Sequence, residues 1–300
     1  MLALKLNREG FFVFAGCLNS SGEGAEDLLN QCPQKHRIRV LQLNVTNQDQ
    51  VDQAFTDVSD FLQSNDQGIR SLFGIVNNAG VADGAQIEWS PSSSIADYQR
   101  VMDVNFYGVL RVTRKFLPLI RRSRGRIVNL SSILGRTSIL GLNMYCVSKA
   151  ATAKFSEGLM SEMGRFGVTV VDVNPWFYKT PMLSPQRILS NMDSAWKSAE
   201  EEVRVSYGGQ RYYDRVSKAC AFTVTDPRNV CQDPHEVVNA LHDALTSYEP
   251  DTVYRLIPPR LGIAFWIIND FLPWDLLIHV RRIVDRLPSY VGARQAKAPA

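Results

Sequence analysis

The sequence predicts an α/β fold, a doubly wound parallel sheet with helices on both faces, and two observations carry this prediction. Short runs rich in Val, Ile and Phe alternate with longer stretches whose apolar residues recur at helical spacing. Several short runs are apolar almost without interruption, as is typical of parallel strands that helices cover on both faces. Such alternation indicates right-handed βαβ units within one sheet.

Each of the expected strands ends at a turn or a helix signal. They cover residues 11–18, 37–45, 71–80, 125–132, 168–175 and 252–258. The helices expected between them cover residues 25–32, 48–63, 96–122, 145–167 and 234–246. The end of an amphipathic helix should precede the first of these strands over residues 2–6. Gly10 stands where a left-handed residue commonly closes such a helix.

Length and composition favour one globular domain with a small extension. The chain has 300 residues, 45% of them hydrophobic, and its 33 basic and 30 acidic residues are interspersed to a net charge of +3. This balance gives no indication of a nucleic-acid partner. We expect an intracellular protein, because the chain shows no signal peptide or presequence and no run of eighteen uninterrupted apolar residues.

The cysteines indicate a reducing compartment and no structural metal. They are odd in number and scattered, without the spacing of metal ligands. They are Cys17, Cys32, Cys146, Cys220 and Cys231. The four histidines show no pairing either, so core or surface roles are expected for them.

We divide the chain into a catalytic domain over residues 1–258 and an apolar extension over residues 259–300. Within the domain, residues from about 176 to 235 are polar and aromatic and follow a strand end, where ligands of open α/β sheets bind. This segment is interpreted as a substrate lid; a plain surface excursion is the alternative. The extension combines apolar bulk and Trp with flanking arginines up to residue 286, which suits a membrane interface. Packing on the domain or on a second subunit explains it equally well.

The stretch from Asn129 to Lys149 carries a candidate acid–base site. Tyr145 and Lys149 are four residues apart on the expected helix, so they share one face. Ser132 stands at the end of the preceding strand, which could bring its hydroxyl to the same place. A phenol, an ammonium and a hydroxyl together can move a proton to or from an alcohol oxygen. A polar pair on a surface helix would give the same tetrapeptide spacing by chance.

Three features coincide at strand ends: the NNAG turn at Asn77–Gly80, Asn105 in DVNFYG, and the set Ser132, Tyr145 and Lys149. Together they resemble the short-chain dehydrogenase/reductase family, over nearly all of residues 1–258. Within it, the chain looks most like 3-hydroxybutyrate, retinol and hydroxysteroid dehydrogenases. The resemblance implies a Rossmann-like sheet and hydride transfer between an alcohol and a nicotinamide cofactor.

The resemblance also implies a role for each site residue. Tyr145 would act as general base in oxidation and as acid in reduction, and Lys149 would lower the phenol pKa and hold the nicotinamide ribose. Ser132 would bind the substrate oxygen, and Asn105 would support a water relay to Lys149. The residues implied to line the cofactor site, besides Tyr145 and Lys149, are Asn44, Asn77, Ala79, Gly80, Pro175 and Thr180.

Cofactor choice is expected to depend on the end of the first strand in this chain. Cys17 takes the position where NAD enzymes often carry Asp, and residues 18–21 hold no cation that could pair with a 2′-phosphate. The absence of a cation favours NAD over NADP.

Two departures from the family pattern stand out. The family opens with a strand and a TGxxxGxG loop that receives the pyrophosphate, and this chain shows neither. Its glycine-rich candidate, Gly16 to Gly24, has the wrong spacing and is expected to be a solvated turn. We therefore expect an N-terminally incomplete form of a longer enzyme, with two apolar strand edges left open inside the sheet.

The second departure is Trp176, in place of a glycine that normally passes close to the nicotinamide, so its ring must turn away.

The sequence thus predicts an NAD-dependent alcohol dehydrogenase whose substrate is a 3-hydroxybutyrate-like acid, a retinoid or a steroid. A small acid would need a cation from the lid, for which the candidates are Lys179, Arg187, Lys197, Arg204 and Arg211. A retinoid or steroid would need an aromatic slot, for which the candidates are Trp176, Phe177, Tyr207, Tyr212 and Tyr213. We expect a homo-oligomer with membrane-surface contact through residues 259–286, at the mitochondrion or endoplasmic reticulum. The alternative is a catalytically dead remnant that acts as an interaction or membrane-associated module.

Overall fold

The computed structural model describes residues 1–64, 68–69, 71–82, 86–89, 95–258 and 276. Its strands pair in parallel wherever they pair, as the alternating pattern predicts. They are β1 (Val13–Cys17), β2 (Ile38–Gln42), β3 (Gly74–Asn77), β4 (Arg126–Leu130), β5 (Thr169–Pro175) and β6 (Val253–Leu256). Each of the expected strands is confirmed, trimmed at its ends where the chain turns into a loop.

The helices between the strands follow the predicted order. They are α1 (Leu2–Arg8), α2 (Glu23–Gln31), α3 (Gln48–Ser64), α4 (Ile95–Met102), α5 (Gly108–Ser123), α6 (Asn143–Met163), α7 (Pro185–Ser198), α8 (Glu201–Ser206), α9 (Gly209–Thr225) and α10 (His235–Thr246). The long helix expected over residues 96–122 is divided. A π-helical turn, Asp103–Tyr107, separates α4 from α5.

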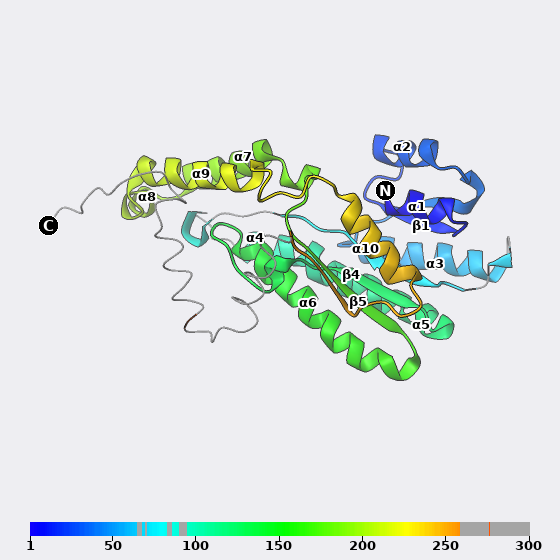
Figure 1. The fold of residues 1–300 in the computed structure, drawn as a ribbon. Helices are drawn as coiled ribbons and strands as arrows, with labels where there is room; N and C mark the ends of the chain where they lie inside the picture. The colour runs from blue at the N-terminus through cyan, green and yellow to red at the C-terminus, as the bar shows by residue number, and fades with distance from the viewer. Residues whose placement is uncertain (65–67, 70, 83–85, 90–94, 259–275, 277–300) are drawn as a thin grey trace.

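The described strands form two separate groups (Figure 1). β1 pairs with β2, and β3, β4, β5 and β6 pair in that order, while no pairing joins β1 to β3 in the described part of the chain. The open edges anticipated inside the sheet are therefore present, and they have not closed on each other. The fold is a Rossmann-like doubly wound sheet without the strand that would join its two groups.

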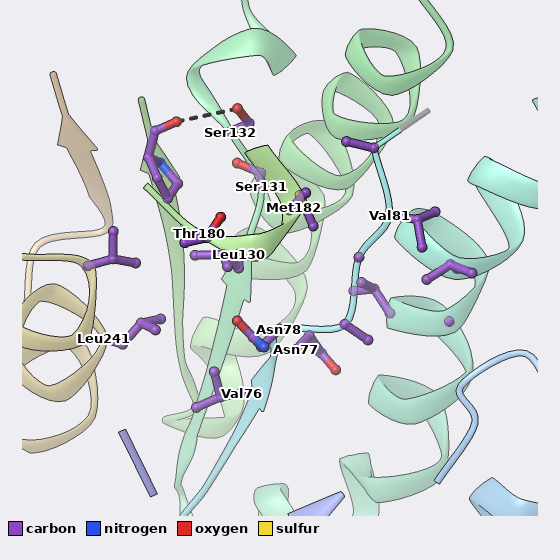
Figure 2. A pocket seen from close by; sticks show the side chains of 18 of the residues that line it. Val76, Asn77, Asn78, Val81, Leu130, Ser131, Ser132, Thr180, Met182 and Leu241 are labelled. Atoms are coloured by element: carbon purple, nitrogen blue, oxygen red, sulfur yellow. Dashed lines mark hydrogen bonds between the residues drawn. The ribbon is translucent and has the colours of Figure 1, made fainter. Parts of the chain in front are cut away.

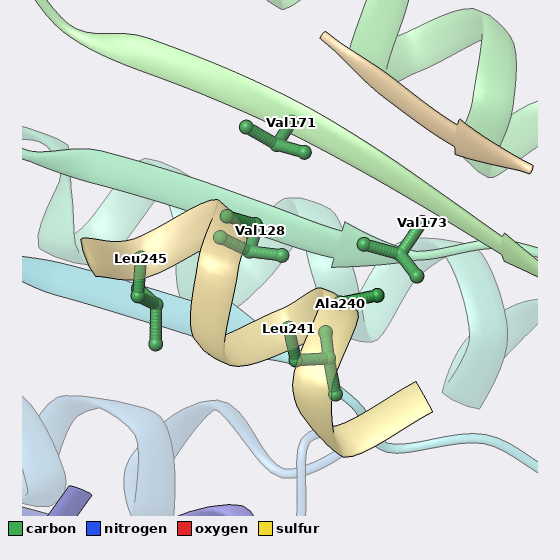
Figure 3. Packing of buried hydrophobic residues seen from close by; sticks show 7 residues of the cluster. Val128, Val171, Val173, Ala240, Leu241 and Leu245 are labelled. Atoms are coloured by element: carbon green, nitrogen blue, oxygen red, sulfur yellow. The ribbon is translucent and has the colours of Figure 1, made fainter. Parts of the chain in front are cut away.

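Helices cover both faces of this interrupted sheet. On one face α10 packs Leu241 and Leu245 against Val128, Val171 and Val173 of the central strands (Figure 3). α1 joins the same cluster through two leucines, Leu2 and Leu6. On the other face α5 and α6 cover β4 and β5, and α3 and α5 cover β1 and β2.

The turn after α1 has the geometry expected from Gly10. This glycine has a φ of 91° and follows the C-cap residue Glu9. The N–H of Gly10 donates to the Asn7 carbonyl at 3.0 Å, and the N–H of Phe11 donates to the Leu6 carbonyl at 3.1 Å. This pair of bonds is the Schellman motif that commonly ends a helix. It turns α1 directly into β1.

The segment interpreted as a lid is helical and has its own core. α7, α8 and α9 pack around Trp89 and Trp196, whose rings meet edge to face at 4.9 Å between centroids. A parallel bridge between Tyr178 and Cys231 joins the beginning and the end of the segment. The apolar extension expected over residues 259–300 lies outside the described residues, except Leu276. Among the described residues, no helix is both long enough and apolar enough to cross a membrane.

Candidate active site

The candidate site lies at the carboxyl ends of β3, β4 and β5, where loops from all three strands converge (Figure 2). A cavity of about 2360 Å³ opens there and continues between β1 and β3. Of the residues expected at the site, all but Asn105 line this cavity. They are Asn44, Asn77, Ala79, Gly80, Ser132, Tyr145, Lys149, Pro175 and Thr180.

Ser132, Tyr145 and Lys149 come together as the spacing predicts. α6 presents Tyr145 and Lys149 on one face, and the Lys149 Nζ lies 5.8 Å from the centre of the Tyr145 ring. Ser132 ends the loop after β4, where its Oγ accepts from the N–H of Leu134 at 3.2 Å and caps a short 3₁₀ turn. The same hydroxyl donates to the Pro175 carbonyl at 3.3 Å (Figure 2).

Burial opposes the charged forms of both titratable groups. It raises the pKa of Tyr145 to about 12, while the hydrogen bond with Ser132 acts to lower that pKa. Burial also lowers the pKa of Lys149 to about 8, and the carboxylate of Asp172 acts to raise it. Both effects follow from the cost of holding a charge away from water. The protein alone therefore leaves the phenol protonated at neutral pH.

Lys149 is held tightly despite this cost. Only 3% of its surface is exposed, and its Nζ donates to the Leu130 carbonyl at 2.7 Å. A methyl group placed on Gly80 would lie 3.5 Å from both the Lys149 Nζ and the Asn105 Oδ1. Gly80 therefore lies directly beside the ammonium.

Asn105 occupies the π-helical turn and is fully buried. Its Nδ2 donates to the Val81 carbonyl and to the Ser148 Oγ, both at 2.9 Å, and its Oδ1 accepts from the Val81 N–H at 2.8 Å. Its own carbonyl accepts from the Thr152 hydroxyl at 2.8 Å. Asn105 thus joins the loop after NNAG to α6. These contacts use its side chain for positioning, and the residue does not line the cavity.

Two of the asparagines expected to meet the cofactor use their side chains within the protein. The Nδ2 of Asn77 donates to Thr113 at 3.0 Å and to Asn129 at 2.7 Å. The Oδ1 of Asn44 accepts from the N–H and the hydroxyl of Thr46. Their side chains therefore shape the loops that line the cavity.

The glycine-rich turn from Gly16 to Gly24 does not offer a phosphate cradle. The N–H of Ser21 already donates to the Asn19 Oδ1 at 3.1 Å, and the N–H of Ser20 donates to the Gln42 Oε1 at 2.9 Å. A phosphate needs free backbone donors at such a turn. The residues expected around the nicotinamide of a dinucleotide therefore fit that group. The turn from Gly16 to Gly24 does not fit the phosphates of a dinucleotide.

Trp176 is accommodated by turning its indole toward the base of the lid. The Nε1 donates to the Asn229 carbonyl at 2.7 Å, and the ring meets Phe177 edge to face at 5.3 Å between centroids. The ring also lines the cavity and packs in the cluster that includes Tyr145, so its turning away from the nicotinamide position stays a prediction.

Only some of the lid residues that the sequence offers as substrate-binding candidates line the cavity. Of the aromatic candidates, Trp176, Phe177 and Tyr212 line the cavity. Tyr207 and Tyr213 instead pack around Trp89, so their expected place in a substrate slot is wrong. None of the five candidate cations is among the residues that line the cavity. They are Lys179, Arg187, Lys197, Arg204 and Arg211.

Sequence reasoning missed two residues of interest. Arg215, on α9, is a lid cation that does line the cavity. Asp172 is 4% exposed in β5, and its Oδ1 is buried without a hydrogen-bond partner in the described part of the chain. A single Asp among the valines of residues 170–173 was the available signal for the second of these. The position of Arg215 depends on how α9 rotates, which the sequence alone does not reveal.

Comparisons with known proteins point in one direction. A family model described as short chain dehydrogenase matches residues 1–188. The mitochondrial D-beta-hydroxybutyrate dehydrogenase of Rattus norvegicus is 35% identical over 85% of this chain and 72% of its own length. Retinol dehydrogenase 5 of Mus musculus is 34% identical over 99% of this chain and 86% of its own length. Estradiol 17-beta-dehydrogenase 2 of Mus musculus is 33% identical, over 93% and 70% respectively.

Solved structures agree on the fold. A short-chain dehydrogenase from Streptomyces avermitilis superposes with a TM-score of 0.66 at 23% identity, covering 96% of this chain and 90% of that one. A short chain dehydrogenase from Burkholderia cenocepacia, solved in complex with NADP, gives a TM-score of 0.60 at 20% identity, with 93% and 90% covered.

Proposed function

The chain belongs to the short chain dehydrogenase family and is an oxidoreductase that acts on alcohols, and we propose that Tyr145 is its acid–base residue. The observation that carries the proposal is the grouping of Tyr145, Lys149 and Ser132 at the carboxyl ends of the strands. A nicotinamide cofactor bound there supplies or accepts the hydride. The chain's own residues orient the alcohol and move its proton.

Each residue of the group has a distinct task in this proposal. Tyr145 accepts the hydroxyl proton in oxidation and returns it to the carbonyl oxygen in reduction. Ser132 donates a hydrogen bond to the substrate oxygen. Lys149 supplies a positive charge beside the phenol, which favours its ionised form and offsets part of the effect of burial.

Asn105 is proposed as a positioning residue, because its side chain joins the NNAG loop to α6. The bond to the Ser148 Oγ lies one residue before Lys149 and three residues after Tyr145. A shift of this helix would move both groups relative to Ser132. The water relay expected from the family is compatible with this place, since Gly80 leaves space beside Lys149 and Asn105.

The substrate proposed is an apolar alcohol of the retinoid or steroid class. Much of the wall next to Tyr145 is apolar and comes from loops and lid together. It includes Ile139, Leu142, Trp176, Phe177, Met182, Leu183, Ile188, Met192 and Val216. Such a lining suits a large apolar ligand fixed by a few polar groups. Arg215 is the feature that favours the competing class, a small hydroxy acid, because a guanidinium pairs well with a carboxylate.

NAD is proposed in preference to NADP. Cys17 ends β1 and lines the cavity, and burial raises the pKa of its thiol, so it stays neutral. Residues 18–21 contribute no cation near it that could pair with a 2′-phosphate. A direct comparison of the two cofactors with the same alcohol tests this preference.

The test of the substrate class is a comparison of kcat/KM for retinol, a hydroxysteroid and 3-hydroxybutyrate with NAD. We expect the apolar alcohols to be preferred, and Arg215→Met to leave their turnover within about twofold of the original, because these alcohols have no carboxylate for the guanidinium to pair with. Arg211→Met is the matched control, since Arg211 lies on the same helix outside the cavity. Preference for 3-hydroxybutyrate, lost in Arg215→Met and kept in Arg211→Met, would contradict the proposal.

A second candidate function is favoured by the occupied turn between Gly16 and Gly24. Because the N–H groups of Ser20 and Ser21 are already engaged, the chain could bind ligands at the nicotinamide end without turnover, as a non-catalytic module. Calorimetry with NAD and with nicotinamide mononucleotide separates the two candidates. Equal, weak affinity for both and no turnover would support the module, whereas much tighter binding of NAD would support the enzyme.

A further inference from the structure

Asp172 places a carboxylate in the middle of β5, a central strand of the sheet. Only 4% of its surface is exposed, and its neighbours in sequence, Val171 and Val173, are fully buried. These two valines pack against α10 (Figure 3), so the alternation of a strand turns Asp172 to the opposite face, toward α6. Val170 lies on that opposite face and shares a cluster with Leu159 of α6. The carboxylate is therefore enclosed between the sheet and a helix.

The same layer holds a buried ammonium. Lys149, on α6, is 3% exposed, and its Nζ donates to the carbonyl of Leu130 in β4. Leu130 pairs in register with Val173, the residue after Asp172. The ammonium therefore reaches the sheet at the level where the Asp172 side chain enters the layer from the next strand. A carbonyl alone does not neutralise a charge, so an ammonium in this place needs an anion nearby.

A short chain of hydrogen bonds holds the Asp172 carboxylate in position. Its Oδ2 accepts from the Nδ2 of Asn174 at 2.8 Å, and the same Nδ2 donates to the Oγ of Ser131 at 2.6 Å. Asn174 and Ser131 are each 2% exposed. Ser131 lines the cavity beside Ser132 (Figure 2), so the chain of bonds reaches from the interior of the sheet to the edge of the candidate site.

The second oxygen of this carboxylate has no comparable contact. The Oδ1 is buried and accepts no hydrogen bond within the part of the chain that the structure describes. Leaving a charged oxygen in this state is destabilising. The amide of an asparagine could accept the same bond from Asn174 with a smaller cost of desolvation. What a carboxylate adds over an amide at this position is its negative charge.

That charge acts on Lys149. Burial lowers the pKa of Lys149 to about 8, and Asp172 opposes this fall. Burial also raises the pKa of Asp172, against its contacts with Asn174 and Ser131 and the positive charges of Lys149 and Arg136. Each member of the pair thus favours the charged form of the other.

Other titratable or charged groups surround the pair. α6 contributes two of them on the side of the cavity, and the loop after β4 contributes a cation whose charge also acts on Asp172. β6 adds a second cation at an exposed position, opposite Asn174 in register. These groups are Tyr145, Cys146, Arg136 and Arg255. None of the four is an acid, so Asp172 is the carboxylate of this set.

From this geometry we propose that Asp172 is a positioning residue, whose buried negative charge keeps Lys149 an ammonium beside the phenol of Tyr145. Asp172 acts through Lys149, because it is not among the residues that line the cavity. The proposal rests on the roles proposed above for Tyr145 and Lys149 and adds a residue beneath them.

The first test is Asp172→Asn, which keeps the shape of the side chain and removes its charge. In carbonyl reduction, kcat/KM should fall at high pH as Lys149 loses its proton. In Asp172→Asn this fall should move to lower pH by about one unit, because the ammonium has lost its counter-charge. An unshifted fall, with only a lower maximum, would overturn the proposal.

Asp243→Asn is the matched control for the change in net charge. Asp243 lies on α10, which covers the other face of the sheet, and its side chain accepts from the hydroxyl of Tyr254. Its substitution should leave the pH profile in place. An equal shift in Asp243→Asn and Asp172→Asn would mean that any lost carboxylate has this effect, and would also overturn the proposal.

A double-mutant cycle tests the pair without any turnover. With Lys149 present, Asp172→Asn leaves the ammonium uncompensated, so the urea midpoint at pH 7 should fall. In the Lys149→Met protein, the same change removes an uncompensated carboxylate, so the midpoint should rise. Equal changes in both proteins, unfolding of both included, would show that Asp172 acts through packing and would overturn the proposal.

The cycle also separates this proposal from the proposed function. Turnover that survives in Tyr145→Phe would contradict the function proposed for the site. Urea midpoints that change equally in the two proteins of the cycle would contradict only the role of Asp172, whereas midpoints that change in opposite directions would support it.

Discussion

At the scale of single residues, burial in the candidate site opposes the charged forms of both Tyr145 and Lys149. Lys149 is almost fully enclosed, and its pKa falls to about 8, while that of Tyr145 rises to about 12. The protein thus holds an ammonium where it is least stable and a phenol that cannot ionise unaided. Burying these two groups lowers the stability of the fold, and two well-packed apolar side chains of similar size would not do so. The burial is therefore consistent with a function that depends on Tyr145 and Lys149.

The first prediction concerns the stability cost of Lys149. Below about pH 8 the folded and unfolded states both carry the charge, so the full cost of burying it is present. Between about pH 8 and 10.5 the unfolded state binds more protons, so stability from this group rises with pH. Lys149→Met should therefore be more stable than the original protein at pH 7, by up to about 3 kcal/mol.

Urea unfolding of both proteins across this pH range checks the prediction. The advantage of Lys149→Met should shrink as the pH rises through 10.5, above which the original lysine is neutral in both states. An advantage that stays constant from pH 7 upward would show that packing, not charge, causes it.

A second prediction concerns the Ser132 hydroxyl. Its hydrogen bond lowers the pKa of Tyr145, so Ser132→Ala should move the acid limb of kcat/KM for alcohol oxidation to higher pH, by about one unit. Ser161→Ala, on the exposed end of α6, is the matched control and should leave the profile in place. A lower maximum with an unshifted limb would mean that Ser132 contacts only the substrate.

At the scale of elements, the local signals of the sequence identify strands and helices well but not the breaks within them. Alternating apolar runs predicted the strands, and Gly10 predicted the turn after α1. The π-helical turn at Asp103–Tyr107 was not predicted, because DVNFYG fits an uninterrupted helix by its apolar spacing. Its cause is tertiary: the Asn105 side chain bonds to Val81 and Ser148, which are distant in sequence.

The lid gives a third prediction, which belongs to this scale. Trp89 is fully buried among Trp196, Tyr207, Tyr212 and Tyr213, and its indole N–H has no hydrogen-bond partner among the described residues. Trp89→Ala should destabilise the lid by about 3–5 kcal/mol and raise KM for the alcohol. Trp89→Phe keeps most of the ring and removes the unpaired donor, so it should cost much less.

Limited proteolysis within residues 185–225 measures the order of the lid directly. We expect faster cleavage in Trp89→Ala and nearly unchanged cleavage in Trp89→Phe. Equal cleavage of all three proteins would show that α7 and α9 do not depend on this cluster.

At the scale of the whole molecule, the chain combines the proposed acid–base group with strands that pair in two separate groups. The fold class and the meeting of Ser132, Tyr145 and Lys149 could be predicted, because strand order places carboxyl ends together and helical spacing places i and i+4 together. The lining of the substrate cavity could not, because it depends on how α7 and α9 rotate. Arg215 faces the cavity and Arg211 does not, although one helical turn separates them.

The measurement that tests the account most directly is alcohol oxidation by the original chain and by Tyr145→Phe, followed as cofactor reduction. Phe preserves the ring and its packing but removes the hydroxyl that we propose moves the proton. We predict a loss of about a hundredfold to ten-thousandfold in kcat, with cofactor binding retained. Turnover in Tyr145→Phe equal to that of the original chain would contradict the assignment of this site.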